Sequence, residues 1–290
     1  MRLYIRRVHR SRNRYTPYQT MNCKSIRLFI SLGLLFFVAC QQECKSIVST
    51  YDNKEAHVIL LYPNCNDTSY YQLQKFYNNG QIAYEGFYKN GEKVGHFKSW
   101  SESGHQTADW TMLDGKEHGR INCWYDDGTK KRESTLNRGV RNGYIREWHS
   151  NGKPASEGTY KNGRQVGMWK TWDQNGTWRV RQYRNDTLWG STIEHLIDST
   201  GITLVAGQYE AGLEEEIWKW FDKDSILYET CTYNKGKLKG ENIEYYKNGH
   251  IKSKANLSDG RYNGFIYYFD STGHPTKKLL YERGNMVVTK

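Results

Sequence analysis

The sequence predicts an all-β protein, built as an array of antiparallel β-hairpin repeats that form one long, twisted, single-layer sheet. Three observations predict it. Turn signals recur with a period of 24 residues, the stretches between them are short, and certain columns inside those stretches stay apolar. A period held over about eight units identifies a repeat architecture before any single element is considered.

Two series of glycines carry the period. The first comprises Gly80, Gly104, Gly128, Gly152, Gly176, Gly201, Gly249 and Gly273, with Ser225 in one place. The second comprises Gly91, Gly115, Gly139, Gly163, Gly212, Gly236, Gly260 and Gly284. Many follow Asn or Asp, and Asn-Gly and Asp-Gly accept the positive φ that a type I′ turn requires at both central positions. Both series therefore predict tight hairpin turns, separated by strands of about 7–9 residues, with no helix between them.

One apolar column has the strongest binding character. It contains Trp100, Trp124, Trp148, Trp172, Phe221, Tyr245 and Phe269, with Phe76 and Ile197 at equivalent positions. A second column runs from Tyr88 to Tyr281, and a third contains Phe97, Ile121, Ile145, Trp169, Trp218 and Ile266. Side chains in a column would lie about 10 Å apart, two strand spacings, and would stabilise the sheet through cross-strand pairs. The first column is either structural stacking or an aromatic platform for a glycan or a peptide.

Two segments show the repeat most clearly. YEGFYKNGEKVGHFKSW ends at Trp100, and SEGTYKNGRQVGMWKTW ends at Trp172, three units later. Their Gly-x-Tyr-x-x-Gly…Gly-x-Trp pattern resembles the MORN repeat, and the 24-residue form is similar to bacterial MORN-variant proteins of the YwqK antitoxin family. The resemblance covers about residues 73–290, which we interpret as a domain of eight to nine units. It implies a scaffold, a dimerisation module or a membrane-associated platform, and the antitoxin label implies neutralisation of a toxin.

The amino-terminal segment resembles the signal of a bacterial lipoprotein. Leu28–Ala39 is an uninterrupted apolar run, shorter than the roughly 20 residues that span a bilayer. Basic residues precede it, as in a signal peptide, so we interpret residues 1–39 as a signal whose true start is Met21. The run ends at Cys40, in a context that resembles a lipobox, and this predicts lipidation of Cys40. Gln41 at the next position implies the outer membrane of a Gram-negative bacterium. The alternatives are an uncleaved anchor and a short buried helix.

Residues 40–72 lack the period and are expected to form a lipidated tether and a capping strand. Cys44 and Cys65 flank a strand-like stretch within this segment, and they either form a disulfide in an oxidising envelope or remain free thiols. Cys123 and Cys231 lie about 4.5 repeats apart, roughly 40 Å at the usual strand spacing. A disulfide needs Cα atoms within about 7 Å, so these two are not expected to pair.

The charge distribution argues against a nucleic-acid partner. Eight basic residues and no acidic residue precede position 28. Removing them from the 42 Lys and Arg leaves 34 basic residues against 31 acidic ones, so the repeats are nearly neutral. Nucleic-acid binding needs a concentrated basic face instead.

No sequence motif indicates catalysis, and we expect neither an enzyme nor a metal or other cofactor. No phosphate-binding loop and no nucleophile elbow occurs, because the glycines follow hairpin turns. His105, His250 and His274 share one turn position but offer too few ligands for a metal.

Two units depart from the repeat pattern. Asn185-Asp186 lacks its turn glycine, and Glu214–Glu216 replaces the usual Val/Leu-x-Gly. Such units reflect either decay of the repeat or a partner site. The function hypothesis is a non-catalytic envelope lipoprotein, anchored in the membrane by its lipid, whose sheet binds another envelope protein or a toxin. The alternative is a glycan-binding module.

Overall fold

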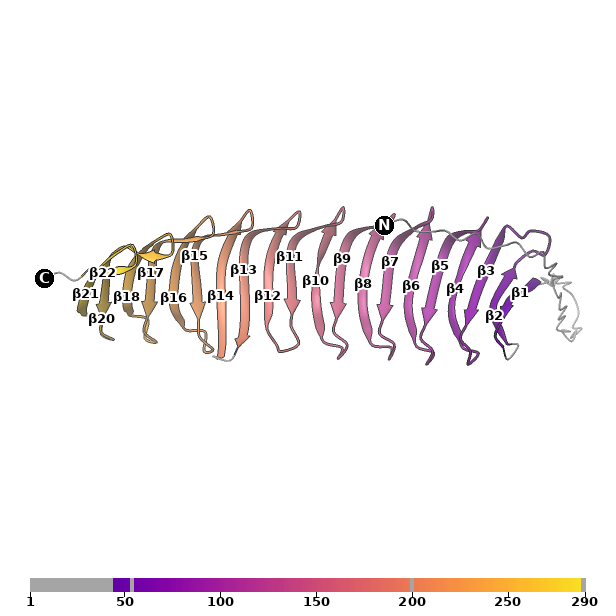
Figure 1. The fold of residues 1–290 in the computed structure, drawn as a ribbon, viewed down its shortest axis with the longest axis horizontal. Coiled ribbons are helices and arrows are strands. Elements are labelled where there is room, and N and C mark those ends of the chain that lie inside the picture. The colour runs from indigo at the N-terminus through magenta and orange to yellow at the C-terminus, as the bar shows by residue number, and fades with distance from the viewer. Residues whose placement is uncertain (1–43, 53–54, 199–200, 288–290) are drawn as a thin grey trace, which may run out of the picture. The chain divides into compact units, whose positions relative to one another are not determined.

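The computed structural model describes residues 44–52, 55–198 and 201–287. All regular secondary structure in these residues is β-strand, and the strands form antiparallel hairpins in sequence order (Figure 1). No helix long and apolar enough to cross a membrane occurs in the part of the chain that the structure describes. The predicted all-β array of hairpins is confirmed.

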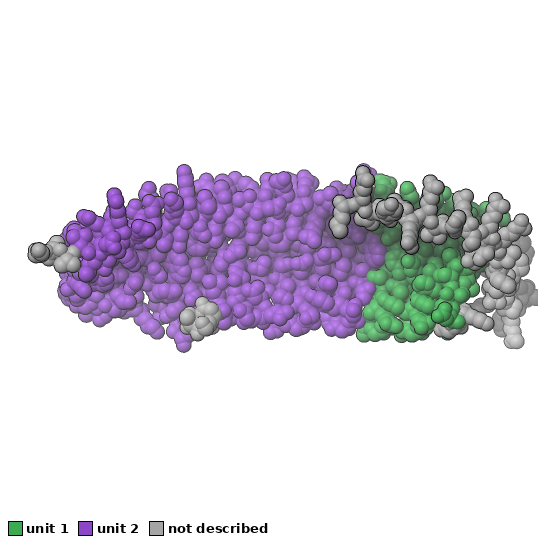
Figure 2. Space-filling model, in the orientation of Figure 1, with its two compact units in different colours: residues 1–106, 112–115 green, residues 107–111, 116–290 purple. Residues whose placement is uncertain are grey.

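The chain divides into two compact units, which are coloured separately in Figure 2. Unit 1 contains residues 1–106 and 112–115, and unit 2 contains residues 107–111 and 116–290. Strand β6 (Gln106–Leu113) has residues in both.

Unit 1 contains β1 (Cys44–Thr50), β2 (Ala56–Tyr62), β3 (Tyr70–Phe76), β4 (Ile82–Lys89) and β5 (Glu92–Trp100). Each of these pairs antiparallel with the next. The described part of the segment 40–72, where the sequence predicts a tether and a capping strand, contains β1, β2 and the first residues of β3. Cys44 and Cys65 form a disulfide, with their Cα atoms 5.3 Å apart.

Unit 2 is also built of hairpins. Its strands are β7 (Lys116–Trp124), β8 (Lys130–Asn137), β9 (Val140–Trp148), β10 (Pro154–Lys161), β11 (Arg164–Trp172), β12 (Trp178–Arg184), β13 (Thr187–Asp198), β14 (Gly201–Glu210), β15 (Leu213–Phe221), β16 (Leu227–Asn234), β17 (Lys237–Tyr245), β18 (Ile251–Ser258), β19 (Arg261–Tyr262), β20 (Gly264–Phe269), β21 (Pro275–Glu282) and β22 (Asn285–Val287). Both β19 and β20 pair with β18, so they are two pieces of one strand divided at Asn263.

The two glycine series form different turns. In the second series both turn residues have positive φ, as at Asn90 (51°) and Gly91 (82°), and the predicted type I′ geometry is correct there. In the first series the glycine has positive φ but the Asn or Asp before it does not. The amide of Gly80 donates to the carbonyl of Tyr77 at 3.0 Å, and the amide of Tyr77 donates to the carbonyl of Gln81 at 2.7 Å. This is a three-residue loop with glycine in the left-handed region, so the type I′ prediction was wrong for this series.

A third set of left-handed residues interrupts one strand of each hairpin. Gly95 has φ 69°, and the ladder shifts beside it, because Gly86 pairs with Phe97 whereas Phe87 pairs with Val94. Such a shift is a β-bulge, in which extra residues of one strand oppose fewer residues of the other. The equivalent residues are Gly119, Gly143, Gly167, Gly190, Gly240 and Gly264 in unit 2, together with Glu216 at φ 58°.

The third apolar column forms the core. In unit 2 its members Ile121, Ile145, Trp169, Trp218 and Ile266 are all buried. The larger side chains lie over glycine, because a Cβ added at Gly158 would collide with the ring of Trp169. Unit 1 uses the same arrangement, with Gly86 beneath the fully buried Phe97. In both units, a large side chain of one strand packs over a glycine of the neighbouring strand. This cross-strand packing stabilises the hairpins without a second layer of structure.

Candidate binding face of unit 2

The two faces of the unit 2 sheet differ in burial. In β9, Ile145 is 2% exposed, whereas Tyr144 is 48% exposed. Successive side chains of a strand point to opposite faces of a sheet, so these two residues mark different faces. We call the face that carries Ile145 the inner face and the face that carries Tyr144 the outer face.

The outer face carries exposed apolar side chains on four alternate strands, and we call this set the outer apolar row. Tyr144, Met168 and Ile217, on β9, β11 and β15, each directly follow the bulge residue of their strand. On β13 that position is Ser191, and the exposed apolar residue is Ile193, two residues further along. The exposed fractions of Tyr144, Met168, Ile193 and Ile217 are 48%, 67%, 43% and 54%, respectively. Each lies next in sequence to a buried residue of the inner face: Ile145, Trp169, Thr192 and Trp218. Polar residues of the intervening strands, such as Thr159 and Gln182, lie beside them. Exposed apolar side chains that recur on one face, unlike a single one, favour an interaction surface.

Basic side chains follow two residues further along the same face. They are Arg146, Lys170 and Lys219, which we call the basic row, and Ile193 occupies the equivalent place on β13. His195 is in register with Trp172 and Phe221 instead. Glu157 on β10 lies between the first two, with 3.0 Å to Arg146 Nη2 and 3.3 Å to Lys170 Nζ. The hydroxyl of Tyr144 donates to Glu157 at 2.7 Å. This hydrogen bond, with those from Lys170 and Arg146, lowers the pKa of Glu157.

The aromatic column predicted from sequence lies two residues further again. Its members are half-buried: Trp100 in unit 1, and Trp124, Trp148, Trp172, Phe221, Tyr245 and Phe269 in unit 2. In unit 2, cations already lie over two of these rings. Lys130 Nζ is 5.0 Å from the ring centre of Trp124, and the Arg146 guanidinium is 5.9 Å from that of Trp148.

The backbone of this column is fixed by residues that the sequence analysis missed. The hydroxyl of Tyr125 donates to the carbonyl of Trp148 at 2.9 Å, and Tyr246 donates to Phe269 at 2.9 Å. His149 Nε2 lies 2.7 Å from the carbonyl of Trp172. The signal was available in the sequence, because a Tyr or His directly follows the aromatic residue of the preceding unit.

The irregular unit around β13 places charge where its neighbours place aromatic rings. Thr192 and Glu194 are buried, at 2% and 8% exposure. Arg181 Nη2 lies 2.6 Å from Glu194 Oε1, and Arg179 Nε lies 3.5 Å from Glu194 Oε2. The hydroxyl of Thr192 donates to the carbonyl of Val180 at 3.1 Å. The unit whose Asn185-Asp186 turn lacks glycine therefore also carries a partnered ion pair on its inner face.

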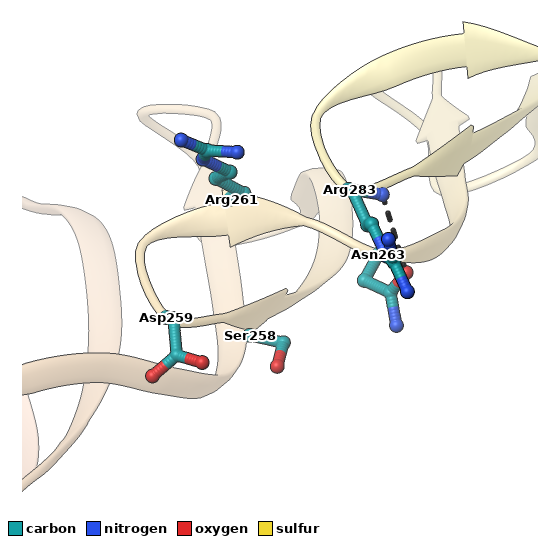
Figure 3. Close-up of a pocket in the computed structure, with 5 residues that line it drawn as sticks. All are labelled: Ser258, Asp259, Arg261, Asn263 and Arg283. Atoms are coloured by element: carbon teal, nitrogen blue, oxygen red, sulfur yellow. Dashed lines mark hydrogen bonds between the residues drawn. The ribbon is translucent and has the colours of Figure 1, made fainter.

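Two shallow pockets occur among the described residues of unit 2. The larger, about 550 Å³, is lined by Cys123, Arg132 and Glu147 among others, and Arg132 Nη2 lies 3.7 Å from the thiol of Cys123. The smaller, about 400 Å³, lies at the turn between β18 and β19. Its side chains do not converge on one point, and the amide of Arg283 donates to Asn263 Oδ1 at 3.4 Å (Figure 3).

The remaining residues considered in the sequence analysis are the other cysteines and the possible metal ligands. Cys40 lies outside the described residues. Cys123 and Cys231 are free thiols, and burial raises the pKa of Cys231 to about 12. Within the described ranges, no group of three or more His, Cys, Asp or Glu could hold a metal ion.

Three hairpins match a known repeat. The family model described as MORN repeat variant matches residues 72–90, 141–162 and 238–259. The chain carries MORN-variant repeats. The first matched segment lies in unit 1, on β3 and β4, and the other two lie in unit 2, on β9–β10 and β17–β18. MORN repeats are generally associated with binding to proteins or membranes, and sheets built from them are typically non-catalytic. No curated protein matches the chain.

Proposed function

We propose that this chain is a non-catalytic envelope lipoprotein, anchored through Cys40 in the outer membrane, whose unit 2 sheet binds a partner protein with its outer face. The observation that carries the proposal is the outer apolar row, in which four large apolar side chains are each at least 43% exposed on alternate strands. Another envelope protein or an incoming toxin is the kind of partner that this face would meet.

The shape and chemistry of the face support a macromolecular partner. Small-molecule sites are concave and bury most of the ligand, whereas the two pockets of unit 2 described above are open to solvent. Protein interfaces instead place apolar and aromatic side chains at the centre and polar groups around them. The outer apolar row and the adjacent basic row have this arrangement, and removing apolar surface from water contributes about 25 cal/mol per Å².

A glycan is the second candidate, because the Trp124 and Trp148 rings are only half-buried. Sugars stack on bare aromatic faces, but Lys130 and Arg146 lie over these two rings. A sugar would therefore have to displace two cation–π contacts, each worth about 0.5–1 kcal/mol at exposed sites. This cost makes the protein partner the better supported proposal.

The test uses a photo-crosslinking amino acid placed at Met168 of the full chain in living cells. We expect discrete protein adducts that disappear when Ile217→Asp is added, since a charge buried without a partner opposes binding. The matched control places the crosslinker at Ile47 in unit 1, whose exposed fraction of 53% is similar. Equal adducts at both positions, or adducts indifferent to Ile217→Asp, would contradict the proposal.

The anchor has a separate test. Growth with a palmitate analogue should label the wild-type chain and leave Cys40→Ser unlabelled. Labelling of both chains, or of neither, would remove the lipoprotein part of the proposal and leave the binding face untouched.

A further inference from the structure

The dipeptide Asn-Gly has a reactivity of its own, and the repeats contain it eight times. The backbone nitrogen of the glycine can attack the side-chain carbonyl carbon of the asparagine, which forms a five-membered succinimide and releases ammonia. Water then opens the ring to aspartate or to isoaspartate. Asparagine is among the thermolabile residues of proteins. The eight asparagines are Asn79, Asn90, Asn142, Asn151, Asn162, Asn175, Asn248 and Asn263.

Hydrogen bonds decide how easily the ring closes in the folded chain. The asparagine side chain must rotate towards the glycine nitrogen, and that nitrogen must leave any acceptor that it binds. Asn248-Gly249 is held at both points. Asn248 Nδ2 donates to the carbonyl of Ser271 at 2.7 Å, and the amide of Gly249 donates to the carbonyl of Tyr246 at 2.9 Å.

Six further pairs are held at one point or at both. Asn79-Gly80 is held at both, since Asn79 Nδ2 donates to the carbonyl of Glu102 at 2.9 Å and Gly80 donates to Tyr77. In Asn162-Gly163 the glycine amide donates to the carbonyl of Arg141 at 2.8 Å. The side-chain oxygens that accept a backbone amide are those of Asn142, Asn151, Asn175 and Asn263.

Asn90-Gly91, in the turn between β4 and β5, is the exception among the described residues, because neither its side-chain amide nor its glycine nitrogen has a hydrogen-bond partner. Both residues are exposed, and no atom lies within 4 Å of the Cβ position of Gly91. The amide of Asn90, and not that of Gly91, donates to the carbonyl of the preceding loop, at Ser69, at 2.6 Å. In the equivalent turns of unit 2, as at Gly163, the glycine makes this bond.

The chain supplies matched references for this turn. The sequence Tyr-Lys-Asn-Gly occurs at residues 88–91, 160–163 and 246–249. Asn90 and Asn162 also share a φ of 51°, and Gly91 and Gly163 have φ 82° and 81°. The residues before the reacting pair and the turn geometry are therefore the same at Asn90 and Asn162, and the hydrogen bond of the glycine amide distinguishes them.

We propose that Asn90-Gly91 is a self-modification site. A bond forms between the Gly91 nitrogen and Asn90 Cγ, the bond from Cγ to Nδ2 breaks, and ammonia leaves with the Gly91 amide proton. Water opens the succinimide and leaves a carboxylate at position 90. The inference goes beyond the proposed function, because the site lies in unit 1 and its chemistry requires no partner.

The isoaspartate product changes the β4–β5 hairpin. It inserts one methylene into the main chain of a two-residue turn, between the paired residues Lys89 and Glu92. A type I′ turn depends on the φ and ψ of two ordinary residues, so the longer linkage does not fit it. We therefore expect the modified hairpin to open more readily than the original one.

The test is incubation of the purified full chain in mildly alkaline buffer, followed by peptide mapping with mass spectrometry. The measured quantity is the rate at which each asparagine becomes an acid. Asn90 should convert about fivefold faster than Asn162, the factor that corresponds to one net hydrogen bond. Asn248, which is held at both points, should convert more slowly than Asn162.

Two controls separate structure from sequence. In guanidinium chloride the three Tyr-Lys-Asn-Gly sites should convert at similar rates, because their local sequences match and no fold holds them. Asn90→Gln should abolish conversion at position 90 and leave the rate at Asn162 unchanged, since glutamine would have to close a larger ring. Equal rates at Asn90 and Asn162 in the folded chain, or a preference for Asn90 that persists in denaturant, would overturn the proposal.

Hydrogen exchange tests the consequence for the hairpin. The isoaspartate form, separated from the fresh chain by ion exchange, should exchange the amides of β4 and β5 faster, while the β10–β11 hairpin of unit 2 stays unchanged as the internal reference. Identical exchange of β4 and β5 in the two forms would show that the turn accepts the longer linkage, and would overturn this part of the inference.

Discussion

Two regions of unit 2 fill the inner face of the sheet with different kinds of side chain. From β7 to β11 the inner column is apolar, with Ile121, Ile145 and Trp169. From β12 to β14 the column gives way to Thr192 and to the ion pair between Glu194 and Arg181. Polar and charged side chains can replace apolar ones in one region because each strand of a repeat array contacts only its neighbours.

The outer face changes in the same region, but in a different way. Ser191 takes the position of Met168 and Ile217 on β13. The exposed apolar residue, Ile193, lies two residues further along, between the buried Thr192 and Glu194. An exposed apolar side chain is therefore kept on this strand although its inner face is polar. The comparison teaches that the two faces are under separate constraints, one for stability and one for binding.

The largest expected effect tests the apolar region. Trp169→Ala removes a buried ring that lies over Gly158, and should cost about 3–5 kcal/mol of the free energy of unfolding. Trp148→Ala, at a half-buried position of the outer face, should cost less. Chemical denaturation measures both, and equal losses would remove the distinction between the faces.

The ion pair is the counterpart in the polar region. Glu194→Gln leaves Arg181 without its anionic partner, and should cost about 1–3 kcal/mol because the charge remains partly buried. The control is Glu241→Gln, whose pair with Lys254 is exposed, where about 0.5 kcal/mol or less is expected. If both substitutions cost the same, the inner ion pair does not replace the apolar core.

A smaller effect tests the bulge of β15. Glu216→Gly should raise the free energy of unfolding by about 1 kcal/mol, since a side chain in the left-handed region costs roughly 1–2 kcal/mol. Gly167→Ala is the matched change in the regular region, where φ is 69° and no atom lies within 4 Å of the added Cβ. It should lower stability by a similar amount. If Glu216→Gly lowers the free energy of unfolding, the backbone at Glu216 is not strained.

The smallest effect concerns pH. Hydrogen bonds from Tyr144, Lys170 and Arg146 lower the pKa of Glu157 in the folded protein. The resulting stability is present above the ordinary glutamate pKa and is lost as pH falls through the lowered one. Unfolding curves between pH 7 and pH 3 should show Glu157→Gln with a shallower acid loss than wild type. The difference should be only a few tenths of a kcal/mol because the cluster is solvent-exposed.

Much of the fold was readable from the sequence because turns and strands report local chemistry. The period, the hairpins and the buried third column all follow from glycine spacing and side-chain size. The two turn types were not separable, because Asn-Gly suits both a type I′ turn and the end of a three-residue loop. The choice depends on loop length, which the Tyr77–Gln81 pair fixes through the strand register.

The candidate site was only partly readable. Sequence reasoning selected the conspicuous Trp column, but exposure depends on which face a residue takes, and a bulge at each glycine resets that alternation. Met168 and Ile217 therefore resemble core residues until the register is known. The Glu194–Arg181 pair joins two strands and has no local pattern.

The hydrogen bonds that join successive hairpins have a further consequence for how such a chain changes over time. Tyr125 reaches Trp148, His149 reaches Trp172, and Tyr246 reaches Phe269, each 23 residues ahead. Because every link has the same length, removing or duplicating one whole period recreates the same links across the new junction. The array can therefore gain or lose units as interchangeable modules, lengthening or shortening its outer face, while a change of any other length would break a link.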